Sequence, residues 1–113
     1  MRIITTILDI NELKAMATAT FGNLVKAVVD VERKLIAVDA ELHSDLEALL
    51  LESGSKQKNL WGINLYPEIQ GDDFVEFDSM INMRPSQGNR SRGIENEEMR
   101  KSIIEIVTKR IKR

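Results

Sequence analysis

An alternating stretch at residues 25–42 constrains the fold more than any other part of the chain. Apolar side chains recur there at every second position, in two sets: Val25, Ala27, Val29 and Val31, then Ile36, Val38, Ala40 and Leu42. This period of two is typical of β-strands, and pairing Val29 with Ile36 places both sets on one face. The segment between the sets has no Gly or Asn, which disfavours a two-residue primed turn. The pattern predicts an antiparallel hairpin with a longer or type I turn.

A second hairpin is predicted downstream. Residues 61–66 and 75–83 alternate in the same way, with apolar positions at Trp61, Ile63, Leu65, Val75, Phe77, Ile81 and Met83. The loop between them contains Pro67 and Gly71, which favour a chain reversal. Tyr66 ends the first of these strands, where its hydroxyl can line the edge of a pocket.

Three helices are predicted from their capping residues. Asp9 precedes an apolar periodicity over residues 10–20, and Asn96 precedes another that continues to residue 111. Ser44 and Glu47 form a capping box for a short helix that ends near Gly54. These signals place one helix before, one between and one after the two hairpins.

The predicted order is therefore (β)-α-β-β-α-β-β-α, with a short strand at residues 2–6 in first place. We expect an α+β fold with a mainly antiparallel sheet of four or five strands and helices on one face. The length of 113 residues fits a single domain over residues 1–113.

Composition excludes several classes of protein. The chain has no cysteine, so disulfide frameworks, thiolate metal sites and cysteine nucleophiles are excluded. Its N-terminus lacks the apolar region of a signal peptide, and no apolar run approaches the roughly 20 residues of a membrane-spanning helix. We expect a cytoplasmic protein with no membrane partner, and no motif predicts a cofactor.

Charge is divided unevenly along the chain. Residues 1–83 contain 7 basic and 14 acidic residues, whereas residues 84–113 contain 9 basic and 4 acidic ones. The basic part opens with the loop RPSQGNRSRG at residues 84–93, which combines arginines with flexible glycines. Guanidinium groups and exposed backbone amides bind phosphate, so the loop is a candidate ligand-binding site. Its candidate residues are Arg84, Ser86, Gln87, Asn89, Arg90, Ser91 and Arg92.

The leading hypothesis is a small binding module that engages a phosphate-bearing ligand, nucleic acid or an acidic partner through this loop. The loop matches neither a P-loop nor a dinucleotide-binding motif, and only 4% of residues are aromatic, which disfavours base stacking. Glu97 and Glu98 also occupy the first turn of the following helix and would repel an anion there. The alternative is that the arginines pair with the protein's own acids, Glu76 and Asp78 among them.

The only histidine suggests a second hypothesis. On a strand, Asp39, Glu41 and His43 project from one face, and one imidazole with two carboxylates can bind a divalent metal or perform acid–base catalysis. This predicts a hydrolase or metal-assisted enzyme centred on His43. No spaced metal motif such as HExxH is present, and an isolated histidine at a strand-to-helix corner is commonly structural. Whether the protein is an enzyme stays open.

A third hypothesis is a structural domain for protein–protein interaction, including a homodimer formed through a sheet edge or face. The location of His43 relative to the arginine-rich loop discriminates among these readings, because their convergence on one concave surface favours a ligand or catalytic pocket.

Two strings, GSKQKNLWGINLYPE and SMINMRPSQGNRSRGI, carry a family resemblance. They resemble a family of short prokaryotic proteins with no established activity, over about Val25 to the C-terminal helix. The resemblance implies a prokaryotic cytosolic protein. It supplies no catalytic residue.

Overall fold

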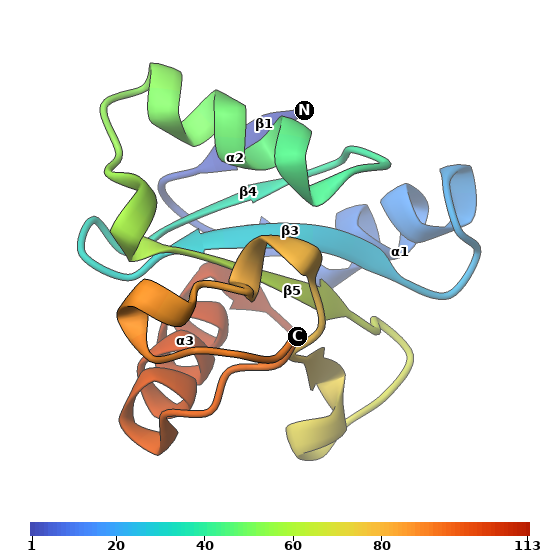
Figure 1. The fold of residues 1–113 in the computed structure, drawn as a ribbon. Helices are drawn as coiled ribbons and strands as arrows, with labels where there is room; N and C mark the ends of the chain where they lie inside the picture. The colour runs from blue at the N-terminus through green and yellow to red at the C-terminus, as the bar shows by residue number, and fades with distance from the viewer.

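The computed structural model describes residues 1–113 and contains one five-stranded sheet with three helices (Figure 1). All neighbouring strands in this sheet are antiparallel. Their spatial order is β1 (Arg2–Ile4), β4 (Leu35–Val38), β3 (Val25–Asp30), β5 (Leu60–Leu65) and β6 (Val75–Glu76). The α+β class, the antiparallel sheet and the approximate element order are as predicted.

The first hairpin has the predicted register. Val29 lies opposite Ile36, and a four-residue turn joins β3 to β4. Asp30 is fully buried at the end of β3, where its Oδ1 accepts hydrogen bonds from the backbone amides of Glu32 and Arg33, both at 2.9 Å. Ser55 donates to the second oxygen of Asp30 at 2.6 Å. This carboxylate therefore stabilises the turn in place of the Gly or Asn that a tighter hairpin requires.

The helices begin largely where their caps indicate. α1 (Ile10–Ala19) follows Asp9, which accepts from the amide of Asn11, and α3 (Glu97–Arg110) follows Asn96, which accepts from the amide of Met99. The predicted Ser44 cap is wrong, because α2 (His43–Glu52) already includes Ser44, Leu42 occupies the N-cap position, and no side chain caps the helix. The buried ring of His43 is hydrogen-bonded to the sheet, which holds this residue inside the first turn.

Helices cover both faces of the sheet, which corrects the prediction that they lie on one face (Figure 1). α1 and α3 pack with Val29 and Ile36 in the larger core, whereas α2 packs with Val28 and Ala37 in a second, smaller core. Strands β3 and β4 are apolar at consecutive positions because they are buried on both sides, a pattern that strict alternation does not describe.

The second hairpin is shorter than predicted. β6 ends at Glu76, and the predicted continuation to Met83 is wrong, because the chain instead forms a short 3-10 helix there. Asn82 is fully buried while Met83 is 46% exposed, so the apolar alternation does not describe which residues point inward.

The remaining elements are short. A separate parallel pair joins β2 (Leu8–Asp9) to β7 (Ile111–Lys112). The 3-10 helices are η1 (Gln57–Asn59), η2 (Gly71–Phe74), η3 (Met80–Asn82) and η4 (Pro85–Gln87). No helix has the length and apolar character needed to cross a membrane.

Gly62 generates the first prediction. A Cβ at this position would lie 2.5 Å from the Cβ of Ser79, so Gly62→Ala forces the segment that contains Ser79 away from the sheet. We expect a loss of about 2 kcal/mol in the free energy of unfolding, measured by urea denaturation. Gly93→Ala is the control, because its nearest new contact is 3.4 Å. Equal stability of the Gly62→Ala variant and the wild type would contradict this packing.

Candidate functional site

The connector at residues 79–93 is attached to the free edge of β5 by a buried asparagine. The side-chain oxygen of Asn82 accepts from the amide of Gly62 at 2.8 Å, and its nitrogen donates to the carbonyl of the same residue at 2.9 Å. The nitrogen of Asn82 also donates to the carbonyl of Arg92 at 3.0 Å, as does the amide of Ser79 at 2.9 Å. These bonds fix the backbone of Arg92 beside the sheet.

Arg84 is bound within the protein. Its guanidinium donates to the backbone carbonyls of Ile81 at 2.9 Å and Gln57 at 2.8 Å, and to that of Leu60. The group also lies 4.5 Å from the centre of the Trp61 ring. Burial lowers the pKa of Arg84, with nearby Glu47 opposing the shift. These contacts join the connector to β5 and leave Arg84 little capacity for an external anion.

Asn89 organises the rest of the loop. It is 4% exposed, and its nitrogen donates to the carbonyls of Asn82 and Gly93, each at 2.8 Å. The backbone amides of Arg90 and Ser91 both donate to one carboxylate oxygen of Glu95, at 2.6 and 3.1 Å. The loop amides expected to cradle a phosphate are therefore occupied by the protein's own carboxylate.

The remaining predicted residues of the loop are exposed. Ser86 makes no side-chain hydrogen bond, and the side-chain nitrogen of Gln87 donates to the carbonyl of Lys58 at 3.1 Å. The side chain of Arg90 makes no hydrogen bond or ion pair. Arg92 donates to Asp78 at 2.7 Å, the kind of internal pairing considered above as the alternative to ligand binding.

Arg92 and His43 line one cleft of about 500 Å³. The cleft lies between the start of α2, the outer part of β5 and β6, and the connector. Its central polar residues are His43, Asn64, Tyr66, Glu76, Asp78 and Arg92, and we call it the His43–Arg92 cleft. Convergence of the histidine with the arginine-rich loop is the arrangement that favours a ligand or catalytic pocket.

His43 is hydrogen-bonded to the sheet through one of its ring nitrogens. It is 9% exposed, and its Nε2 lies 2.8 Å from the carbonyl oxygen of Ile63. A carbonyl oxygen only accepts, so Nε2 carries the proton and Nδ1 of the neutral ring is an acceptor. Burial lowers the pKa of His43 below 6.5, and the bond to Ile63 opposes this shift; Lys26 adds to the lowering.

Asn64 connects the histidine side of the cleft to its acids. Its nitrogen donates to Glu76 at 2.9 Å, and the hydroxyl of Tyr66 donates to the same carboxylate oxygen at 2.9 Å. Burial and the adjacent Glu76 raise the pKa of Tyr66. The Oδ1 atom of Asn64 is buried without a hydrogen-bond partner. The side chain of Asn64 also interacts with His43, and this interaction opposes the lowering of the His43 pKa.

The cleft combines charged groups with an apolar rim. Arg92 and Lys26 supply the cations, and the nitrogen of Lys26 lies 5.1 Å from the centre of the Phe21 ring. Phe21, Leu42 and Met80 also line the cleft and are 43%, 55% and 63% exposed. Large apolar side chains exposed around a polar depression are typical of interaction sites.

Asp39 and Glu41 do not join His43 in this site. Neither lines the cleft, and Asp39 leaves the strand with a positive φ of 73°. The structure contains no group of three or more His, Asp or Glu side chains placed to hold a metal ion. The predicted triad assumed that the strand continues to residue 43, whereas β4 ends at Val38.

Lys26 and Asn64 were not among the predicted site residues. Each is a polar residue on a mainly apolar strand, and the register places the two opposite one another across β3 and β5. Two polar residues paired across buried strands indicate a polar site. The sequence shows each residue, but their pairing is known only once the strand register is known.

The fold is a small α+β domain, and its His43–Arg92 cleft combines polar and apolar residues. A family described as proteins of unknown function (DUF5674) matches residues 2–110, so the chain belongs to this family. Comparisons with curated proteins and with solved structures gave no match.

Arg84 generates a prediction about stability. Arg84→Ala leaves backbone acceptors at the β5 edge without a donor, so we expect a loss of about 2 kcal/mol in the free energy of unfolding. Arg90→Ala in the same loop is the matched control and should change stability by less than about 0.5 kcal/mol. Equal losses in urea denaturation would refute the structural role of Arg84.

His43 generates a prediction about pH. Because its pKa is lower in the folded than in the unfolded protein, the unfolded protein binds the proton more readily as pH falls below 6.5. The free energy of unfolding should therefore decrease as the pH falls below 6.5. His43→Gln removes the titrating ring and should flatten this slope. An unchanged slope in the variant would show that other groups cause it.

Proposed function

We propose that the protein binds a small anionic ligand, such as a phosphate-bearing molecule, in the His43–Arg92 cleft. The observation that carries this proposal is that Arg92 and Lys26 line the same cleft as His43. Arg92 uses its Nε on Asp78, which leaves both terminal guanidinium nitrogens for a bidentate contact with an anion. Of the three arginines in the loop, only Arg92 is proposed to bind the ligand.

The ligand needs a donor as well as an anionic group. Arg92 and Lys26 attract negative charge, whereas Glu76 and Asp78 line the same cleft and favour a donor group on the ligand. Phe21, Leu42 and Met80 offer contact to an apolar part. A volume of about 500 Å³ suits a small organic molecule with an amino or hydroxyl group near its anionic group.

Nucleic acid and acidic proteins are alternative anions for the same cations, and self-association is the alternative use of the apolar rim. A cysteine-free chain whose sequence resembles short prokaryotic proteins suits the prokaryotic cytoplasm, so small cytoplasmic metabolites are the first ligands to test.

Acid–base catalysis is a second candidate function. The lowered pKa of His43 keeps its ring neutral near pH 7, and Nδ1 is not engaged by Ile63. A neutral imidazole beside an anion-binding arginine can accept a proton from a bound hydroxyl group. His43→Gln would then abolish turnover of a substrate while Arg92→Ala mainly raises its KM.

The proposal predicts that Arg92→Ala weakens binding of O-phosphoserine and AMP about tenfold, measured by isothermal titration calorimetry. Arg90→Ala is the matched control, because it removes the same charge from the same loop outside the cleft. The two probes share a phosphate, and only O-phosphoserine presents an amine next to it.

Three outcomes would contradict the proposal. Neither probe binds saturably at low salt, or Arg92→Ala and Arg90→Ala weaken binding of the probes equally. The third is that a monomer–dimer equilibrium of the protein accounts for all of the measured heat. A short RNA that binds the wild type and loses affinity equally in both variants would instead indicate an extended basic surface.

A further inference from the structure

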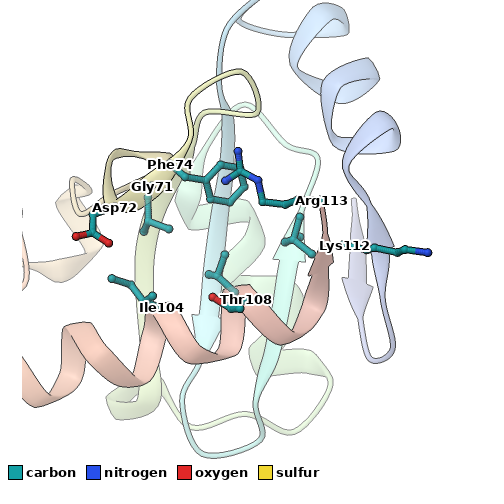
Figure 2. A pocket seen from close by; sticks show the side chains of 10 residues that line it. Gly71, Asp72, Phe74, Ile104, Thr108, Lys112 and Arg113 are labelled. Carbon is teal, nitrogen blue, oxygen red and sulfur yellow. The ribbon is translucent and has the colours of Figure 1, made fainter.

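A second cavity lies between η2 and the C-terminal half of α3, and it shares no lining residue with the His43–Arg92 cleft. Figure 2 shows Ile104 and Thr108 on α3 facing the segment that carries Gly71 and Phe74. The cavity volume is about 350 Å³. Its apolar walls are formed by Phe74, Val75, Ile104, Val107 and Ile111. All of these except Ile104 also belong to the larger core, so the walls are continuous with a packed interior.

Arg113 is fixed at the edge of this cavity. Its guanidinium lies over the Phe74 ring (Figure 2), with the guanidinium carbon 4.1 Å from the ring centre. One terminal nitrogen donates to the carbonyl of Ile69 at 2.8 Å. Stacking and one hydrogen bond hold the group in position while its other nitrogens make no hydrogen bond. The guanidinium is therefore a positioned donor beside an apolar space.

Two more features set the polarity of the cavity. The hydroxyl of Thr108 lines it without a hydrogen-bond partner in the protein. Asp72 and Lys112 also line it, and Lys112 extends away from Phe74 (Figure 2). Arg113 is thus the charged group that stacks on the apolar wall, and Asp72 on the loop side disfavours a second anionic group.

We propose that this cavity binds a small monocarboxylate with an aliphatic chain, of the short- or medium-chain fatty acid type. The chain occupies the space between Phe74, Ile104 and Val107, and the carboxylate accepts from Arg113 and from the hydroxyl of Thr108. A neutral alkane chain would leave Arg113 unused, and an amine would be repelled by it. The cation and the apolar walls together specify an amphipathic anion.

Calorimetric titration with octanoate, octan-1-ol and octylamine tests this assignment on the full chain. We expect saturable binding of octanoate, weaker binding of octan-1-ol and the weakest binding of octylamine. Arg113→Gln should weaken octanoate about tenfold and leave octan-1-ol unchanged. Ile104→Trp, which fills the cavity from α3, should abolish binding of both. Lys109→Gln removes an exposed cation of the same helix that does not line the cavity, and should have no effect.

Several results would overturn the assignment. Octylamine binding as tightly as octanoate would show that the charge of Arg113 plays no part. Equal affinity of octanoate for Arg113→Gln and the wild type would also show that the charge of Arg113 plays no part in binding. Loss of octanoate binding in Arg92→Ala but not in Arg113→Gln would place the ligand in the His43–Arg92 cleft, in support of the proposed function and against this second site.

Discussion

The pairing of the Asn82 side chain with the backbone of Gly62 is the interaction on which the rest of the structure depends. β6 covers the outer edge of β5 only at Asn64 and Leu65, so the edge near Gly62 has no neighbouring strand. Asn82 supplies one acceptor and one donor to Gly62, the two bonds that a strand residue would make. Gly62 permits this approach because any side chain there would collide with Ser79. The side-chain amide of Asn82 thus takes the place of a neighbouring strand at Gly62.

The composition of the arginine-rich loop follows from this arrangement. A connector that runs along an unpaired sheet edge must satisfy buried backbone groups with side chains, and Arg84 and Asn89 do so. Glu95 in turn accepts from the amides of Arg90 and Ser91. Arg84, Asn89 and the amides of Arg90 and Ser91 therefore stabilise the fold, whereas Arg92 lines the cleft.

The sequence predicted the elements whose signals are local. Asp9 and Asn96 cap their helices, and Val29 pairs with Ile36, because capping and alternation depend on neighbouring residues. It did not predict that α2 covers the second face, since the apolar residues Val28 and Ala37 that attract it interrupt an otherwise clear alternation. The pairing of Asn82 with the edge of β5 was not predicted for a related reason. Asn82 falls at a polar position of an apparent strand, and it is buried only because of this tertiary contact.

The site was predicted in part. His43 and Arg92 were candidates on separate segments, but Asp39 and Glu41 were grouped with His43 on the assumption of a longer strand. Asn64 and Lys26 gained significance only from the register of β3 with β5. Contacts between residues far apart in the sequence decide which polar groups share a cleft, and a single sequence does not encode them in a local pattern.

We propose that a neutral His43 shares its cleft with an Arg92 that binds the anionic ligand. His43 is the only histidine, so a long-range ¹H–¹⁵N spectrum reports this ring alone. We predict the Nε2–H tautomer at pH 7 and signals that shift on addition of O-phosphoserine to the wild type but not to Arg92→Ala. A charged ring or the Nδ1–H tautomer at pH 7, or an equal shift in both proteins, would contradict the account.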